Sequence, residues 1–192
     1  MHGYSDAPNE VLDQALALTT TAVELDDNDG RCHWLLGLIQ RYRGDVHSAE
    51  RHFQRAIALN PNDADAIVGS GRLLAFRGRV EQGIDRIREA MRLNPYHPEW
   101  YWVNLGSVLY LARKYADAAE VFGRVTRPGY WILCRLAGCY AQLGRMDEAT
   151  KTAAEALRLR PDFSVAKLQL RECQTTEAEH IRDGLRKAGL PG

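Results

Sequence analysis

Two histidines, His47 and His52, are the first residues in this sequence that could do chemistry, by holding a metal ion. Zinc motifs on a helix place two histidines four residues apart, so that both imidazoles point to one ion, but these two are five apart. A third histidine, His33, stands beside Trp34 in an apolar stretch. We therefore expect packed or partly exposed histidines and no metal site.

An acidic run at residues 26–29, Asp-Asp-Asn-Asp, offers the oxygen ligands that calcium prefers. The glycine and the distal glutamate of a calcium-binding loop are not at the required spacing. Aspartate and asparagine are also the residues that most often cap helices. The run is expected to end one helix and to cap the next.

The four cysteines, Cys32, Cys134, Cys139 and Cys173, form no C-x-x-C pair. We expect structural thiols, which are typical of a reducing compartment, and therefore a cytoplasmic protein. The first six residues do not resemble a signal sequence, and no apolar run is long enough to span a membrane. Neither type of glycine-rich phosphate loop is present, so no catalytic residue, cofactor or metal is expected.

Six arginines between residues 72 and 92 could form a phosphate-binding stripe: Arg72, Arg77, Arg79, Arg86, Arg88 and Arg92. Acidic residues, Glu81, Asp85 and Glu89, are interleaved with them. The whole chain has 25 basic and 25 acidic residues, and hence no net charge. A solvated helix face is expected here, and neither nucleic acid nor a membrane surface is expected as a partner.

The elements that carry these residues follow from a recurring phrase, Leu-x-Pro, which ends in Pro61, Pro95 and Pro161. The first two prolines are 34 residues apart. Proline lacks an N–H and disfavours helix in the residue before it, so each phrase is expected to end a helix. Small and aromatic residues return in the same register: Gly37 with Gly71, Gly44 with Gly78, Ala56 with Ala90, and later Gly106, Phe122, Ala137, Gly144 and Ala156.

This pattern resembles the tetratricopeptide repeat, a pair of antiparallel helices, A and B, with a period of 34 residues. Four copies are predicted, at residues 30–63, 64–98, 99–129 and 130–163, with a tightened turn at 127–129 where the third copy is short. The resemblance implies an all-α fold, a right-handed superhelical solenoid. Small residues let the helices approach closely, and the glycines between A and B allow the chain to reverse.

Residues 1–29 are predicted to be an N-terminal half repeat, because the helical spacing over 8–26 has the register of a helix B. A helix B without its helix A leaves an apolar side uncovered. Three explanations stay open: the first residues cover that side, a second chain covers it, or the polypeptide is cut from a longer one.

Residues 164–192 are predicted to be C-terminal capping helices. Ser164 is expected to cap a helix through Val165, Leu168 and Cys173. A capping box at 176–179 then opens a last helix, which Gly189 ends. Its apolar side carries Ala178, Ile181, Leu185 and Ala188. We expect both helices to close the solenoid; the alternative is a detachable partner helix.

Residues 94–101, 139–149 and 184–191 resemble the C-terminal tetratricopeptide regions of bacterial class III adenylate cyclases and of related winged-helix regulators. In that family the region follows a catalytic or DNA-binding domain. The resemblance implies a regulatory or scaffolding segment, and it carries no catalytic residue into this chain.

In the tetratricopeptide family the A helices line a concave groove. The residues predicted to line it here include Asn104 and Arg135, which lie next to the matching positions. The full set is Arg31, Trp34, Leu38, Arg41, Tyr42, Arg72, Phe76, Trp100, Val103, Asn104, Ser107, Tyr110, Trp131 and Arg135. Aromatic residues with arginines are typical of protein-binding hot spots. The predicted function is a scaffold that binds a peptide or helix, with the chain's own C-terminal helix or a second copy as possible occupants. The alternative is an oligomerisation or regulatory element of a larger signalling protein.

Overall fold

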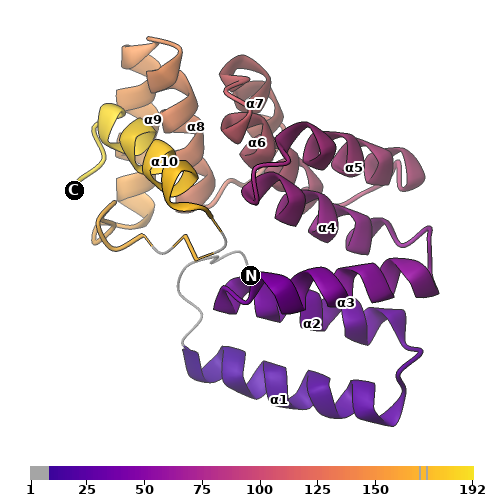
Figure 1. The fold of residues 1–192 in the computed structure, drawn as a ribbon. Coiled ribbons are helices and arrows are strands. Elements are labelled where there is room, and N and C mark those ends of the chain that lie inside the picture. Colours follow the sequence, from indigo (N-terminus) through magenta and orange to yellow (C-terminus); the bar gives the residue numbers. More distant parts are fainter. Residues whose placement is uncertain (1–8, 169, 172) are drawn as a thin grey trace. The chain divides into compact units, whose positions relative to one another are not determined.

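The computed structural model describes residues 9–168, 170–171 and 173–192. Within these residues lie ten helices and no strand (Figure 1), so the predicted all-α fold is confirmed. The helices are α1 (Asn9–Leu25), α2 (Gly30–Arg43), α3 (Val46–Leu59), α4 (Ala64–Phe76), α5 (Val80–Leu93), α6 (Trp100–Leu111), α7 (Tyr115–Phe122), α8 (Tyr130–Gln142), α9 (Met146–Leu159) and α10 (Thr175–Lys187).

The described chain forms two compact units. We call residues 9–97, with α1 to α5, the N-terminal unit, and residues 98–192, with α6 to α10, the C-terminal unit. The pairs α2–α3, α4–α5, α6–α7 and α8–α9 each pack together, and each pair lies inside one predicted repeat. The first helix of a pair is an A helix and the second a B helix.

The Leu-x-Pro phrases end the B helices as predicted. Helices α3, α5 and α9 stop at Leu59, Leu93 and Leu159, and the residue before each proline adopts a non-helical C-cap conformation. The reversal between A and B uses a left-handed residue, with φ of 84° at Gly44, 87° at Gly78 and 75° at Gly144. Glycine adopts this conformation at little cost. In the third repeat Arg113 adopts it, with φ of 59°.

Glycines let an aromatic ring lie directly on helix backbone. The side chain of Phe53 on α3 is fully buried between α2 and α4. A Cβ atom at Gly37 on α2 would lie 2.8 Å from this ring, and one at Gly69 on α4 would lie 2.5 Å from it. Both distances are shorter than van der Waals contact. The ring therefore fits only between two glycines, and this contact sets the spacing of the three helices.

The third repeat is shortened in its B helix, and the chain turns at residues 123–124, before the predicted turn at 127–129. Helix α7 has 8 residues, whereas α3, α5 and α9 have 14 each. The carboxylate of Glu99 accepts hydrogen bonds from the backbone N–H and the hydroxyl of Thr126, at 3.0 and 2.7 Å. These bonds join the turn to the start of the same repeat.

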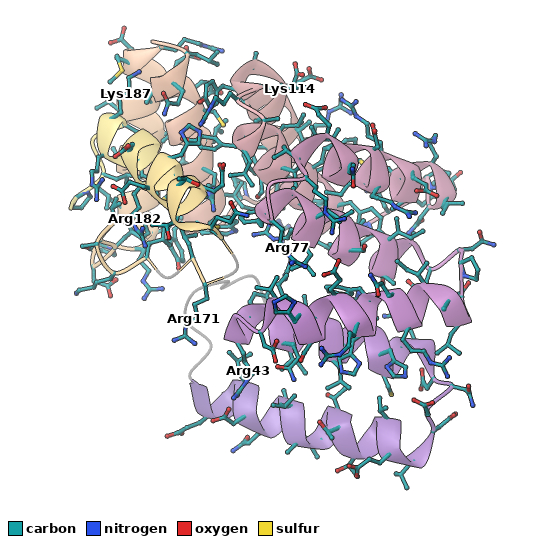
Figure 2. The ribbon with its side chains drawn as sticks, in the orientation of Figure 1. Arg43, Arg77, Lys114, Arg171, Arg182 and Lys187 are labelled. Carbon is teal, nitrogen blue, oxygen red and sulfur yellow. The ribbon has the colours of Figure 1, made fainter. Side chains whose placement is uncertain are left out.

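The predicted N-terminal helix forms as α1 and packs on α2, where Arg43 makes an ion pair with Asp13 (Figure 2). Thr19 is buried, at 5% exposure, and its neighbours along the helix, Ala15 and Ala22, are half-buried. Three large apolar residues point away, with exposures of 52% for Val11, 74% for Leu18 and 84% for Leu25. Among the described residues, α1 thus keeps the uncovered side that the sequence predicted.

The predicted helix through Val165, Leu168 and Cys173 is wrong, since no helix forms between α9 and α10 in the described residues. The Ser164 hydroxyl does not cap a helix but donates a hydrogen bond to the carbonyl of Gly192, at 2.8 Å. The Val165 N–H donates to the carbonyl of Pro191, at 2.8 Å. The segment also has short local bonds, from the N–H of Lys167 to the carbonyl of Ser164 and from the N–H of Leu168 to that of Val165, both at 3.2 Å, but these do not continue as a helix.

The last helix forms as α10 and ends before Gly189, whose φ is 87°, as predicted. The predicted capping box at 176–179 is wrong. Helix α10 begins at Thr175 after Gln174, with no capping hydrogen bond from a side chain. Glu179 instead forms ion pairs with two arginines of the same helix. One is Arg182, three residues further along, and the other is Arg186, seven residues further along.

We predict that Gly69→Ala destabilises the N-terminal unit by roughly 1–3 kcal/mol, because the added methyl group overpacks the core. Phe53 cannot yield, since Gly37 lies against its other side. The matched control is Gly30→Ala, whose methyl would meet its nearest neighbours at 3.6 Å, an ordinary contact. Urea unfolding followed by circular dichroism measures both. Equal midpoints would contradict this packing.

Candidate binding surfaces of the two units

On the A helices of the N-terminal unit, arginines stack on aromatic rings. The guanidinium carbon lies 4.4 Å from the ring centroid for Arg31 over Trp34 and 4.9 Å for Arg41 over Tyr42. A third pair, Arg72 over Phe76 on α4, has a distance of 4.4 Å. We call the surface formed by these six residues the N-terminal A-helix face. The predicted groove residues of this unit are thus brought together in pairs.

The members of this face differ in exposure. Arg31 is exposed and binds Asp65, one repeat further on, at 2.9 Å. Trp34 and Tyr42 are half-buried, as is the predicted groove residue Leu38. Three others are buried: Arg41, Arg72 and Phe76. The predicted groove residues of α2 that a partner could contact are therefore Arg31, Trp34, Leu38 and Tyr42.

In the C-terminal unit the predicted groove residues are mostly buried. Trp100 is half-buried, whereas Val103, Asn104, Ser107, Tyr110, Trp131 and Arg135 are buried. The Asn104 amide donates to the carbonyl of Trp100 at 2.7 Å, and the Ser107 hydroxyl donates to that of Val103 at 2.8 Å. Their polar groups thus bond within α6. On α8, Arg135 stacks on Trp131 at 4.6 Å.

Helix α10 covers part of this surface. A Cβ atom at Gly184 would lie 1.8 Å from the Tyr110 hydroxyl oxygen, so a side chain there would overlap it. A Cβ atom at Gly138 on α8 would lie 3.5 Å from both Tyr110 and Leu185. Tyr115 and His180 share a hydrogen bond of 3.2 Å. We call the surface of Tyr110 on α6 and Gly138 and Gln142 on α8, with Tyr115 of α7 beside it, the C-terminal A-helix face. The chain's own last helix packs on it.

Burial under α10 changes the chemistry of Tyr110. It raises the pKa of the hydroxyl to about 12, because the phenolate would lose its water. Gln142 and Arg135 act in the opposite direction and are weaker. The hydroxyl is therefore neutral at physiological pH and serves as a packing surface.

A hollow of about 680 Å³ lies over α3, α4 and α5 in the N-terminal unit, and the sequence analysis did not predict it. Apolar residues such as Ile57, Leu73 and Leu74 line it together with charged ones. Arg77 and Arg79 bind Glu50, and Arg86 binds Glu89. The solvated helix face predicted for this arginine stretch is found for Arg79, Arg86, Arg88 and Arg92, which are exposed. It is wrong for Arg72, which is buried on α4.

A signal for this hollow was present in the sequence. Ser70, which lines it, stands at the repeat position where the other three repeats carry leucine. Those leucines are Leu36, Leu105 and Leu136. A short side chain at this position leaves space that leucine would fill.

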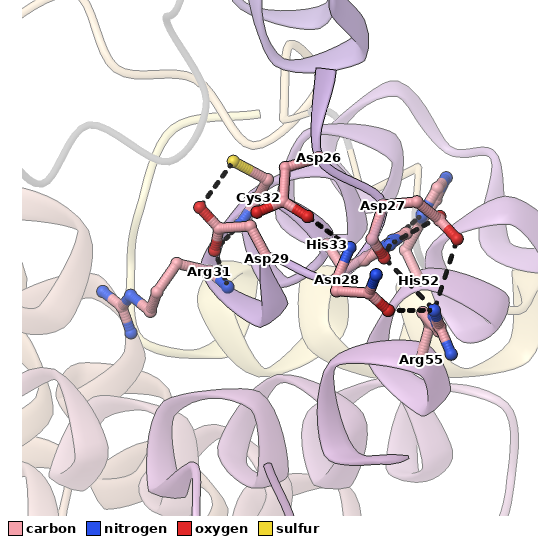
Figure 3. Close-up of polar contacts among 9 residues, drawn as sticks. All are labelled: Asp26, Asp27, Asn28, Asp29, Arg31, Cys32, His33, His52 and Arg55. Carbon is pink, nitrogen blue, oxygen red and sulfur yellow. Dashed lines mark hydrogen bonds and ion pairs between the residues drawn. The ribbon is translucent and has the colours of Figure 1, made fainter. Parts of the chain in front are cut away.

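The acidic run caps a helix, as predicted (Figure 3). The Asp29 carboxylate accepts hydrogen bonds from the backbone N–H groups of Arg31 and Cys32, at 2.8 and 3.2 Å. Asp26 accepts one from the N–H of Asn28, at 2.9 Å. These aspartates are therefore used in the turn between α1 and α2.

Two histidines meet beside this turn, which the sequence analysis did not predict (Figure 3). The Nδ1 atoms of His33 and His52 lie 3.1 Å apart, and Nε2 of His33 lies 3.1 Å from the carbonyl oxygen of Asp27. If Nε2 of His33 donates to Asp27, its Nδ1 accepts a hydrogen bond from the Nδ1–H of His52. In the part of the chain that the structure describes, no group of three potential ligands could hold a metal ion.

The cysteines are free thiols, and Cys134 and Cys139 are buried as predicted. Burial raises the pKa of each of these two thiols to about 12, so neither forms a reactive thiolate near neutral pH. No helix among the described residues is long and apolar enough to cross a membrane.

Sequence profiles described as tetratricopeptide repeat match residues 30–63, 68–129 and 132–163, which together make up most of the chain. The helix pairs and their glycine contacts agree with these matches. The chain belongs to the tetratricopeptide repeat family. Tetratricopeptide repeats are scaffolds for protein–protein interaction and are generally non-catalytic. The matches identify the repeat itself and do not extend to the cyclase and regulator regions that the sequence resembled.

Two relatives share part of this tetratricopeptide array. Cellulose synthase operon protein C of Xanthomonas axonopodis pv. citri (strain 306) is 31% identical over 150 residues, 72% of this chain and 10% of that protein. The BBSome complex member BBS4 homolog of Drosophila melanogaster is 26% identical over 155 residues, 72% of this chain and 31% of that protein. The chain thus spans a third or less of the length of each relative.

Solved tetratricopeptide structures share the fold. The thermophilic tetratricopeptide protein TTC0263 of Thermus thermophilus is 23% identical, with a TM-score of 0.68 over 80% of this chain and 85% of that one. YrrB, described as having an unusual peptide-binding site, is 18% identical, with a TM-score of 0.58 over 88% of this chain and 90% of that one.

We predict that mild acid destabilises both units. Burial lowers the pKa of His52, with His33 and Arg51 adding to the effect, and burial also lowers that of His180, with Arg113 adding to it. The unfolded chain then binds more protons than the folded one between each folded pKa and 6.5, so stability is lost as the pH falls through this window.

Thermal midpoints at pH 7.5 and 5.5 measure this loss. An asparagine at position 52 keeps a hydrogen-bond donor near the Nδ1 of His52, and a glutamine at position 180 keeps one near the Nε2 of His180. Neither amide side chain titrates. His52→Asn and His180→Gln should each reduce the loss, whereas His47→Gln, at an exposed position on α3, should not. An identical loss in all four proteins would contradict the prediction.

Proposed function

We propose that this chain is a scaffold module that binds peptide or helical segments of other proteins on its A-helix faces. One observation carries the proposal: half-buried aromatic residues, Trp34 and Tyr42, lie beside arginines on the N-terminal A-helix face. Partly exposed aromatic rings gain favourable burial when a partner covers them. Arginine and aromatic residues are also the most frequent anchors of protein interfaces.

The arrangement of charges supports a protein partner with apolar anchors and one or two acidic residues. Arg31 is exposed, its guanidinium carbon lies 4.4 Å from the ring centroid of Trp34, and its Nη1 pairs with Asp65. A partner carboxylate could bind its other N–H groups while an apolar side chain covers the ring. The net charge of zero gives no support to a nucleic acid or membrane partner. A cytoplasmic location is consistent with the free thiols.

YrrB is described as having a peptide-binding site, and the shared fold supports the same use of this chain. The alternative, an oligomerisation or regulatory element of a larger signalling protein such as a nucleotide cyclase or transcriptional regulator, stays a prediction from the sequence. Light scattering separates the two, because an oligomerisation element has a mass above that of one chain.

We predict that Tyr42→Ala weakens binding of peptides selected from a displayed library by about thirtyfold, or about 2 kcal/mol, as expected for an anchor residue. Tyr42 is suitable because it is half-buried, whereas Phe76 and Tyr110 are fully buried and their truncation would test stability instead. Fluorescence anisotropy measures the dissociation constants.

Arg88→Ala, at an exposed position on α5, is the matched control and should bind as the wild type does. Circular dichroism shows whether each variant remains folded. A folded Tyr42→Ala variant with native affinity for every selected peptide would exclude the N-terminal A-helix face as the site.

A further inference from the structure

Helix α10 is seated on the C-terminal A-helix face in a way that defines what this face accepts. Its buried side carries Ala178, Ile181, Gly184, Leu185 and Ala188. Three of these residues are glycine or alanine, so α10 packs closely on α8 and on the side chain of Tyr110 from α6. In sequence terms the side reads A-x-x-I-x-x-G-L-x-x-A.

The tightest point of this contact is Gly184. A Cβ atom there would lie 1.8 Å from the Tyr110 hydroxyl and 3.2 Å from the Gln142 amide nitrogen. Tyr110 is itself only 1% exposed, and its ring lies 5.3 Å from Tyr115 and 5.2 Å from His180. His180 belongs to α10, whereas Tyr115 belongs to the repeats, so a larger side chain opposite Tyr110 would push its ring against Tyr115. The face therefore favours a helix that has glycine opposite Tyr110.

The attachments of α10 make it replaceable. It reaches the face through a non-helical segment, to which Arg182 of α10 donates a hydrogen bond at the carbonyl of Leu168, at 3.2 Å. On the side of the repeats, His180 of α10 shares a hydrogen bond with Tyr115. Two large aliphatic side chains, Ile181 and Leu185, supply most of the buried apolar surface.

We propose that the C-terminal A-helix face is a binding site for an amphipathic partner helix with glycine opposite Tyr110 and short aliphatic residues around it, and that α10 is the tethered occupant which such a helix replaces. This rests on the proposed function and names the partner class. The outer side of α10 is charged, with Glu179, Asp183 and Arg186 exposed, so the occupant of this face has one apolar and one charged side.

The test uses the full chain and a fluorescent peptide of residues 174–192. Gly184→Leu in the chain should displace its α10 and leave the face open, so the native peptide should bind this variant at least tenfold more tightly than it binds the wild type. A peptide that carries Gly184→Leu should bind at least thirtyfold more weakly. A peptide with Lys187→Ala, at an exposed position, should bind as the native peptide does.

A second variant covers the case in which Gly184→Leu unfolds the C-terminal unit. Leu185→Ala removes an aliphatic contact with Gly138 but keeps the glycine, so it should also bind the native peptide more tightly than the wild type does. Circular dichroism and a cooperative thermal transition establish folding.

Three results would overturn the proposal: a folded chain variant with no greater affinity than the wild type, equal binding of the native and Gly184→Leu peptides, or a dimeric wild type that the peptide converts to monomers. The last would place the α10 of a second copy on the face. If the proposal fails while library peptides still depend on Tyr42, only this inference falls and the proposed function stands.

Discussion

An aromatic ring packed on bare helix backbone is the contact on which the rest of this structure depends. Phe53 lies between Gly37 and Gly69, and a Cβ atom at Gly106 would lie 2.8 Å from the ring of Phe122. In each contact the ring lies where the glycine would otherwise carry a side chain. The neighbouring helices can therefore pack more closely than they could with a side chain at that position. The register of the repeats, and with it the position of every surface residue, follows from these few pairs.

The same type of contact attaches α10. Tyr110 packs on Gly184 as Phe53 packs on Gly69, but the ring now lies on an A helix, and the glycine lies on a helix outside the four repeats. The two units therefore present their A helices differently among the described residues: the N-terminal face keeps half-buried Trp34 and Tyr42, whereas the C-terminal face lies partly under α10. A single chain thus combines a face with surface aromatics and a face that carries a tethered helix.

Local signals in the sequence were sufficient for much of the fold. Proline at 61, 95 and 161 and glycine at 44, 78 and 144 act through the backbone of their own neighbourhood, so the ends and reversals of the helices could be predicted from them. The segment that starts at Ser164 could not, because Ser164 and Val165 also form hydrogen bonds to Gly192 and Pro191, which are distant in the sequence. A helical spacing of apolar residues does not reveal such partners.

The candidate surfaces were predictable in part for the same reason. Repeat position identified which residues share the A-helix side, but not which of them other groups would bury. Asn104 and Ser107 bond within α6, and His33 meets His52 from the next helix, and neither arrangement has a signature in residue type. The hollow beside Ser70 did have one, a serine at a leucine position, whose meaning depends on the packing of three helices.

Native-state hydrogen exchange of the wild-type chain, followed by mass spectrometry in low concentrations of denaturant, tests the central claim most directly. If α10 is a tethered occupant held by a glycine contact and two aliphatic side chains, its amides should exchange through a local opening, with a lower free energy than those of α8 beneath it. Amides of α10 and α8 that exchange together, at one free energy and with one dependence on denaturant, would contradict the account, since α10 would then be part of the folding unit of the repeats.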